Sequence, residues 1–472
     1  MRASHEQSVA LLQKQIRELS STNLCLSNAK TSSNTTRNAP YKLQASRLDI
    51  SHLDRVVEVD QKNKTALVQP RISMYALCKA LLPLGLVPKV VPEFKGITVG
   101  GAINGCGGES NSHRVGLFHN NCLEYELILA SGDKIHASCS NHSDLFEALH
   151  GSYGSLALLT SAKIALSEAS SFVRVRYKRF SDIHAAIDYM RNGSDAEFLE
   201  GIVFSEQHAV IIEGWPADEV HGTLRHFSQA SSPWFYQHAR TQKDNHEEYL
   251  PLIDYLFRYD QGAFWMGAYV MRPGVLLPCL LEGVLKVKSE PEKWLNDEEV
   301  EDYATIQDPG VFQRYLSASC MQSQPLYRLL HKAETWVQRR FIVQDLTLPE
   351  SKAVECLDYL CKECPIFPLW LCPVTKSSPS QLFCPTSLET SDAKCLNIGV
   401  YGIANSQKPT STLLASLEEK VSELQGRKWL YTNSEYTHEQ FWKIYSKESY
   451  QAIRDKYDSG RLFVSIDQKV LA

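Results

Sequence analysis

The sequence lacks several features that mark common classes of protein. No run reaches the roughly 18 uncharged apolar residues of a membrane-spanning helix, and the first residues lack the apolar stretch of a secretory signal. Neither sign of charge dominates, because 49 Lys and Arg stand against 54 Asp and Glu, for a net charge of −5. No long basic stripe is present, so we expect no nucleic acid as a partner.

The cysteine pattern also lacks the marks of a disulfide framework or a metal site. The 13 cysteines are odd in number and scattered over a long sequence, which is typical of reduced thiols in the cytosol. Cys361 and Cys364 have the spacing of half a zinc site, but no second close pair and no nearby histidines accompany them. We therefore expect no bound metal.

Composition divides the chain into two parts. All eight tryptophans lie at Trp215 or later, whereas glycines gather between Gly96 and Gly116. The content of 43% hydrophobic and 22% charged residues is ordinary for a folded protein. At roughly 150 residues per domain, the chain is long enough for two or three domains.

Hydrophobic periodicity predicts a mixture of short hairpins and helices, which favours an α+β fold over a doubly wound parallel sheet. In the N-terminal part we expect a helix that carries Val9, Leu12, Ile16 and Leu19 on one face, a helix over 72–84, and hairpins at 56–68 and 124–136. A short helix is also expected at 144–149. Further on, the patterns predict helices at 183–191, 216–230, 325–340, 350–362 and 410–424, and strands at 171–177, 201–213, 366–372 and 396–401. The charged region 286–310 is expected to be loop.

The most informative segment runs from Thr98 to Gly116. Its five glycines between residues 98 and 110 permit positive φ and close approach of the backbone to a ligand, and successive free N–H groups there would form an anion-binding nest. A plain surface loop is the alternative. The segment is neither a Walker A loop nor a standard Rossmann fingerprint. The candidate cofactor-binding residues are Thr98, Val99, Gly100, Gly101, Ala102, Ile103, Asn104, Gly105, Cys106, Gly107, Gly108, Glu109, Ser110, Ser112, His113 and Gly116.

Two further loops support the same site. One is a run of small hydrogen-bonding residues that ends in a cation, with the candidates Ser33, Asn34, Thr35, Thr36 and Arg37. The other interrupts an apolar stretch and contributes Gly151, Ser152 and Gly154. Three polar or glycine-rich loops beside strand-like sequence suit a long cofactor that carries a diphosphate.

The order of these loops resembles the FAD-binding domain of the PCMH, or vanillyl-alcohol oxidase, type. Within that superfamily the chain resembles the Δ24-sterol reductases. The resemblance rests on Pro92-Glu93, Thr98 to Gly101, Glu109 to Phe118, Val343 to Asp345, Leu369 to Pro373 and Ile398 to Gly402, and it spans nearly the whole chain.

This resemblance implies a two-subdomain FAD-binding domain at residues 1–170 and a substrate-binding or cap domain at 171–472, with the C-terminal end as a candidate to return to the FAD domain. The cofactor is expected to be FAD, bound non-covalently because no His or Cys lies between Ala29 and Pro40. NADPH is the implied co-substrate. The implied substrate is a small hydrophobic sterol or terpenoid, and the implied location is the cytosol or the surface of the endoplasmic reticulum membrane; the oligomeric state is left open.

The implied reaction is reduction of a carbon–carbon double bond in the substrate's side chain, in which a proton adds to the less substituted carbon and a hydride to the other. We expect Tyr401 to support proton delivery, with a core role as the alternative and Tyr431 and Tyr436 as the next candidates. Arg258 and Asp260 are either close to the active site or part of a structural anchor. An oxidase or dehydrogenase of an alcohol, lactone or hydroxy acid is the second functional hypothesis, and a binding protein without flavin is the third.

Overall fold

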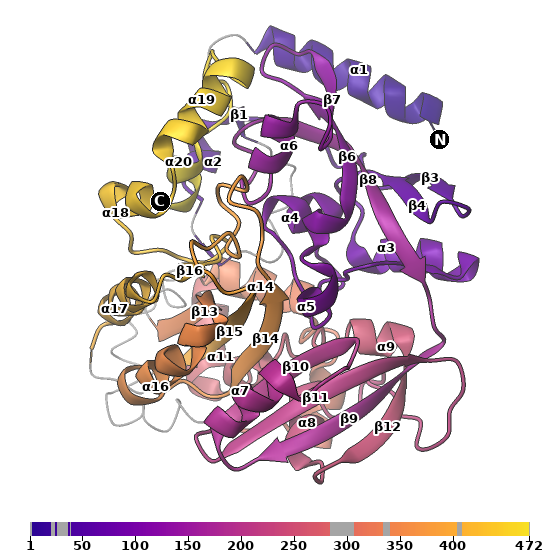
Figure 1. Ribbon diagram of the computed structural model, residues 1–472, viewed down its shortest axis with the longest axis vertical. Helices are drawn as coiled ribbons and strands as arrows, with labels where there is room; N and C mark the ends of the chain where they lie inside the picture. The colour runs from indigo at the N-terminus through magenta and orange to yellow at the C-terminus, as the bar shows by residue number, and fades with distance from the viewer. Residues whose placement is uncertain are drawn as a thin grey trace.

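The structure, a computed structural model, describes residues 2–19, 24–25, 36–37, 39–283, 306–333, 340–403 and 408–471. Two antiparallel sheets dominate it, one in each part of the chain, and helices lie around both (Figure 1). The predicted α+β class is therefore confirmed. Among the described residues, no helix is long and apolar enough to cross a membrane.

The first sheet belongs to the N-terminal part. It contains β3 (Val56–Asp60), β4 (Thr65–Val68), β8 (Leu158–Glu168), β6 (Cys122–Ile128) and β7 (Lys134–Ala137) in that spatial order, and β5 (Leu86–Pro88) pairs with β8. The helices of this part are α1 (Arg2–Glu18), α3 (Met74–Leu81), α4 (Val99–Asn104), α5 (Ser112–Val115) and α6 (Ser143–Ala148). As predicted, α1 buries one apolar face, which carries Val9, Leu12 and Ile16. The fourth residue predicted on this face, Leu19, lies after the end of the helix and is only partly buried. The short elements α2 (Tyr41–Gln44), β1 (Leu24–Cys25) and β2 (Ser46–Arg47) complete it.

The second sheet has eight strands. In spatial order they are β12 (His246–Pro251), β9 (Phe172–Phe180), β11 (His208–Ala217), β10 (Phe198–Ser205), β14 (Leu369–Thr375), β15 (Lys394–Ile403), β13 (Phe341–Pro349) and β16 (Arg427–Lys428). Three helices, α7 (Ile183–Asn192), α16 (Ala353–Glu363) and α17 (Thr410–Glu423), pack on one face of this sheet and form a separate core with it.

The alternation of side chains in β14 and β15 determines what the opposite face presents. Leu369, Leu371, Ile398 and Val400 belong to the core under the three helices. The residues between them therefore point the other way, toward the first sheet, because successive side chains in a strand lie on opposite faces.

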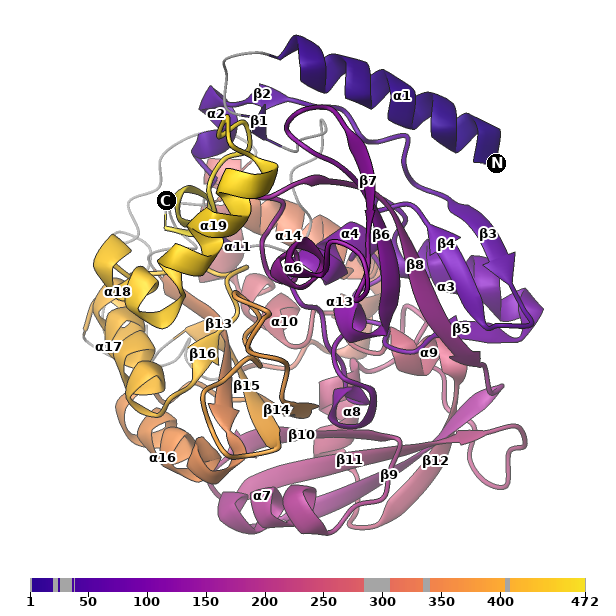
Figure 2. The ribbon, with the colours of Figure 1, turned by 45° about the horizontal axis from the view of Figure 1, so that its top comes forward.

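The remaining helices lie between and beside the sheets. They are α8 (Phe235–Thr241), α9 (Leu252–Leu256), α10 (Met266–Val270), α11 (Pro273–Gly283), α13 (Val311–Ser317) and α14 (Ser323–Lys332). The chain ends with α18 (His438–Ile444), α19 (Lys447–Tyr457) and α20 (Ile466–Val470). Figure 2 shows α19 near α6 of the N-terminal part.

The C-terminal helices contact the N-terminal part through specific polar groups. Lys456 and Tyr457 on α19 bind the carboxylate of Asp144, at 2.7 and 2.8 Å. On α20, the ammonium of Lys469 donates to the backbone carbonyls of Tyr153 and Gly154, at 3.0 and 2.9 Å. The last residues of the chain therefore stabilise the loop that contains Gly154.

Two predicted elements are wrong. The segment 216–230 is not a helix: Pro216 and Ala217 end β11, and Thr223 and Arg225 exchange backbone hydrogen bonds with Tyr249. The expected strand at 201–213 is a hairpin of β10 and β11 with a turn after Ser205. Most of the region 286–310 lies outside the described residues, as do 334–339 of the helix expected at 325–340.

Candidate functional site

A cavity of about 370 Å³ lies between the glycine-rich segment and the second sheet. The second sheet contributes Asp345 from β13, Trp370, Cys372 and Val374 from β14, and Asn397 and Tyr401 from β15. The residues from β14 and β15 are those that point away from the core under the three helices. Glu93, Phe94, Tyr327, Trp429 and Tyr431 complete the wall beside them.

Ten of the predicted cofactor residues line this cavity. They are Arg37, Thr98, Gly100, Gly101, Ala102, Asn104, Gly105, Gly107, Gly108 and Gly154. Eleven others are described but do not line it: Thr36, Val99, Ile103, Cys106, Glu109, Ser110, Ser112, His113, Gly116, Gly151 and Ser152. Ser33, Asn34 and Thr35 lie outside the described residues.

The first half of the glycine-rich segment forms the short helix α4. The hydroxyl of Thr98 caps it by accepting a hydrogen bond from the amide of Gly101 at 3.2 Å. The amides of Gly100, Gly105 and Gly107 donate to backbone carbonyls of the protein itself, each at 2.8 Å. The expected nest of successive free N–H groups is therefore wrong at these three positions.

The glycines of this half serve close packing rather than unusual dihedral angles. A Cβ on Gly100 would lie 2.9 Å from the side chain of Pro70. At Gly101 a Cβ would lie 3.1 Å from the Thr98 hydroxyl and would meet no other described residue within 4 Å beyond its own helix backbone and chain neighbours. Cys106 (φ 56°) and Gly116 (φ 75°) have positive φ, whereas Gly101 and Gly105 do not.

The second half of the segment joins the two parts of the chain. The amide of Leu199 donates to the carbonyl of Ser110 at 2.8 Å, and the ring of His113 hydrogen-bonds the carbonyls of Ser110 and Ala196. The hydroxyl of Thr375 donates to the carbonyl of Ser112 at 3.4 Å. This half therefore positions the second sheet against the cavity.

The two other loops meet at one end of the cavity. The guanidinium of Arg37 lies 4.4 Å from the centre of the Tyr153 ring and donates to the carbonyl of Leu430. Asn104 accepts hydrogen bonds from the hydroxyl of Ser152 and the amide of Gly154, at 3.3 and 2.9 Å. A buried cation and α4 are thus brought together at the cavity.

Asp345 is the centre of a hydrogen-bonded cluster in the opposite wall. Its carboxylate accepts from the hydroxyls of Tyr401 and Tyr431, at 2.7 and 2.5 Å, and from the amide of Asn397 at 2.7 Å. Burial and the Asp345 charge raise the pKa of Tyr401 well above its usual value. Because its proton is directed to Asp345, Tyr401 positions this carboxylate. Its ring packs over Gly399, where a Cβ would overlap the Tyr401 hydroxyl.

Glu93 is a cavity residue that was not predicted as a site residue, although Pro92-Glu93 is part of the resemblance. Burial, together with the charges of Glu109 and Asp345, raises the pKa of Glu93 to about 8. A carboxyl with this pKa retains its proton at neutral pH. Glu93 lies in an irregular stretch before Thr98, and its position in the sequence carries no periodic signal.

Arg258 and Asp260 do not line the cavity. Arg258 is fully buried and forms ion pairs with Glu109 and Glu200, both at 2.8 Å. Asp260 accepts hydrogen bonds from the hydroxyl of Ser323 at 2.6 Å and the amide of Lys95 at 3.0 Å. Of the two interpretations left open, the geometry favours a structural anchor.

Comparisons with known proteins agree with this geometry. A family model described as an FAD binding domain matches residues 6–138. Delta(24)-sterol reductases of Macaca fascicularis and Homo sapiens are each 28% identical over 481 residues, covering 99% of this chain and 86% of the relative. The chain is a homologue of the Delta(24)-sterol reductases. The Arabidopsis thaliana Delta(24)-sterol reductase is 27% identical over 470 residues, or 92% of this chain and 78% of the relative.

The cavity suits FAD, the ligand named in the description of the matching family model. Closely packed glycines leave one wall without side chains, and the cation of Arg37 at one end is available to a phosphate. Gly101 has no side chain, and a Cβ at this position would occupy part of the cavity wall. The residues present therefore fit FAD.

Proposed function

We propose that the protein is an FAD-dependent reductase of a carbon–carbon double bond in the side chain of a sterol or terpenoid, with NADPH as electron donor. The homology covers 99% of the chain, so it includes both walls of the cavity. The observation that carries the proposal is this cavity, which has glycines and a cation on one side and aromatic side chains with a buried acid on the other.

The residues of the first wall hold the cofactor. Arg37 and the cavity-facing half of the glycine-rich segment bind FAD without a covalent bond. Bound FAD, once reduced by NADPH, supplies a hydride. The protein must therefore supply orientation, a dry pocket and a proton.

Glu93 is the proton source in this proposal. An isolated alkene has no carbonyl to stabilise an anion, so one alkene carbon must take a proton while the other takes the hydride. The Glu93 carboxyl faces the cavity and is protonated at neutral pH, since its pKa is about 8. The phenols of Tyr401 and Tyr431 are already directed to Asp345.

The aromatic wall keeps the reacting atoms away from water. Phe94 and Trp370 are 5% and 6% exposed, and both line the cavity. Aromatic faces also attract positive charge, which develops on the substituted alkene carbon after protonation. The negative charge of the Asp345 carboxylate also stabilises this positive charge.

An exposed apolar face suits the supply of a water-insoluble substrate. We define the α11/α13 face as Leu277 and Leu280 of α11 with Val311, Phe312, Tyr315 and Leu316 of α13; each is between 39% and 73% exposed. The helix α11 packs on α14, which contributes Tyr327 to the cavity. We propose that this face rests on a lipid bilayer, because aromatic and aliphatic side chains favour the membrane interface.

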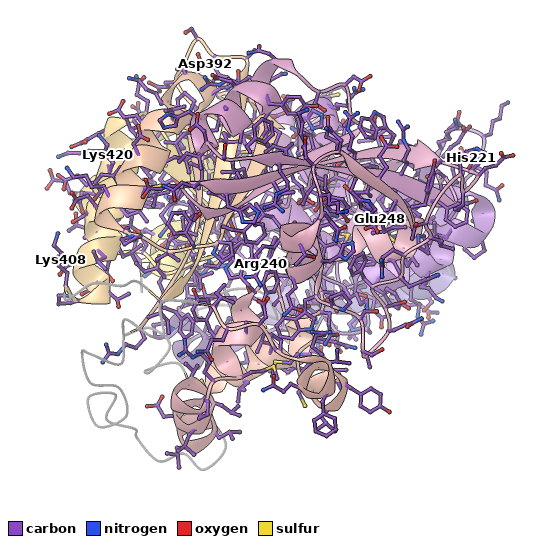
Figure 3. All side chains as sticks on the ribbon, turned by 90° about the horizontal axis from the view of Figure 1, so that it is seen from below. His221, Arg240, Glu248, Asp392, Lys408 and Lys420 are labelled. Carbon is purple, nitrogen blue, oxygen red and sulfur yellow. The ribbon has the colours of Figure 1, made fainter. Side chains whose placement is uncertain are left out.

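The orientation of α13 reverses the usual amphipathic pattern. Its apolar residues face outward, whereas Arg314 is buried and donates to the carbonyl of Pro309 at 2.6 Å. Just before α13, Asp308 forms an ion pair with Arg240, which is labelled in the view from below (Figure 3). These contacts hold the apolar side of α13 outward.

The test is a set of half-reactions on the purified protein. We expect a yellow protein that releases free FAD on denaturation, loses flavin colour with NADPH alone, and regains it anaerobically with a sterol that has a side-chain double bond. Flavin left on the precipitated polypeptide would contradict non-covalent binding. Failure of NADPH to bleach the flavin, with bleaching by an alcohol instead, would favour an oxidase.

A further inference from the structure

Behind the glycine-rich wall lies a buried group of two cysteines and a histidine. We define the Cys–His–Cys cluster as Cys106, His119 and Cys384, each no more than 1% exposed. One ligand atom from each residue lies within 4.8 Å of the other two. These residues are far apart in the sequence and do not include the Cys361–Cys364 pair.

Three separate segments bring the cluster together. Cys106 follows the end of α4, His119 lies in the 3-10 turn Phe118–Asn121, and Cys384 lies in the connection between β14 and β15. Cys106 has φ 56°, a left-handed conformation that costs a non-glycine residue energy and often marks a functional position. The glycines on both sides of Cys106 line the cavity.

The distance between His119 and Cys384 is close to the one expected between two ligands of a tetrahedral metal. With Zn–S near 2.3 Å and Zn–N near 2.0–2.1 Å, ligand atoms on one zinc ion are roughly 3.5–3.8 Å apart. His119 Nε2 and Cys384 Sγ are 3.9 Å apart. The Gln381 Oε1 atom hydrogen-bonds the same nitrogen at 2.9 Å, so an oxygen ligand also lies beside the cluster.

Two hydroxyl groups lie beside the sulfur of Cys384. The hydroxyls of Thr386 and Ser377 lie 3.2 and 3.5 Å from its sulfur. Hydroxyl groups at these distances can donate hydrogen bonds to a thiolate. Metal ligation requires the thiolate form.

The histidine ring is held by its packing. It stacks on the ring of His150 with centroids 4.3 Å apart, and His150 in turn hydrogen-bonds the Tyr125 hydroxyl at 3.0 Å. Nδ1 of His119 is buried and has no hydrogen-bond partner within the described residues. Packing therefore fixes the ring with Nε2 at 3.9 Å from the Cys384 sulfur and with the ligand atoms of the cluster within 4.8 Å of one another.

We propose that Cys106, His119 and Cys384 bind one Zn²⁺ ion, with Gln381 Oε1 or a water molecule as the fourth ligand. The site is structural, because all three side chains are buried away from the cavity. It ties the glycine-rich wall to the connection between β14 and β15, so it fixes the FAD wall relative to the aromatic wall.

The test is metal content in protein purified without chelators from zinc-supplemented cells. We expect about one zinc per protein molecule in the wild type, and less than about 0.1 in Cys384→Ser and His119→Ala. Cys122→Ser is the matched control, since Cys122 is also buried but lies outside the cluster, and it should keep its zinc. Replacement of zinc by Co²⁺ in the wild type should produce thiolate-to-cobalt absorption, which needs no variant to fold.

Three results would overturn the proposal. One is wild-type protein with less than about 0.1 zinc per molecule and no thiolate-to-cobalt absorption. Another is equal loss of zinc from Cys122→Ser and Cys384→Ser. The third is a Cys106–Cys384 disulfide in the freshly purified wild type, seen as two missing thiols on titration of the denatured protein. None of these readouts depends on activity or on the proposed reductase function.

Discussion

Replacement of Glu93 by Gln tests the proposed proton source directly. Glutamine has nearly the same shape as the protonated carboxyl but no acidic proton to give. Removal of a general acid typically slows a reaction by ~10²–10⁴-fold. We therefore expect Glu93→Gln to bind FAD and to be reduced by NADPH normally, while reoxidation by the alkene slows by that factor.

The pH dependence sharpens this prediction. Only the protonated carboxyl donates, so the wild-type reoxidation rate should be flat below about pH 8 and fall tenfold per pH unit above it. The assay is anaerobic stopped-flow measurement of flavin absorbance after mixing the reduced protein with the alkene. Glu93→Asp keeps an acid and should restore part of the rate and the pH break. An unchanged rate and an unchanged break in Glu93→Gln would refute the reasoning.

Stability provides a second readout on the same variant. The pKa of Glu93 is raised from 4.5 to about 8 in the folded protein, so between these pH values the unfolded state releases a proton that the folded state keeps. The stability of the wild type should therefore fall as pH rises through this window. The gain in melting temperature of Glu93→Gln over the wild type should grow up to about pH 8 and then level off.

Four further predictions follow from the contacts. Tyr401→Phe removes one donor to a buried carboxylate and should slow alkene reoxidation by about tenfold, near the low end for a hydrogen bond to a charged group, with the pH break kept; an unchanged rate makes it a packing residue. Gly101→Val should reduce the FAD content of the purified protein, because its side chain fills the bare wall; full flavin content contradicts this. Arg258→Ala should lower the free energy of unfolding by about 3–5 kcal/mol in urea titrations, because it leaves buried carboxylates unpaired. Phe312→Ser with Leu316→Ser should reduce co-flotation with phosphatidylcholine vesicles while FAD content is unchanged; equal flotation would exclude this face.

Local hydrophobic patterns were sufficient to predict a helix or strand that has an apolar face of its own. The helix α1 and the strands β14 and β15 were predicted because their buried residues recur with the period of the element. The turn between β10 and β11 was missed because it is formed by Glu206 and Gln207, which are not among the residue types that usually occupy turns. The hydrophobic pattern of this short segment therefore did not distinguish two adjacent buried strands from one long strand.

The candidate site, too, could be predicted from local sequence only in part. The glycine-rich segment was identified from its composition, and its first half does line the cavity. Neither Glu93 nor Asp345 was among the predicted site residues, because their burial depends on segments distant in the sequence. Asp345 is held by Asn397, Tyr401 and Tyr431, at least 52 residues away. Such contacts are set by the tertiary fold and leave no local spacing to detect.

The alternation of side chains in the second sheet determines which residues line the proposed active site. In β14 and β15 the residues toward the helices are aliphatic, whereas the residues toward the cavity are Trp370, Cys372, Asn397 and Tyr401. A slip of one residue in either strand would exchange these two sets, because side chains alternate with a period of two. The slip would expose leucines to the cavity and bury Asn397 or Tyr401 among aliphatic side chains. The core under α7, α16 and α17 therefore fixes which groups reach Asp345, so packing on the far face of the sheet determines the composition of the site.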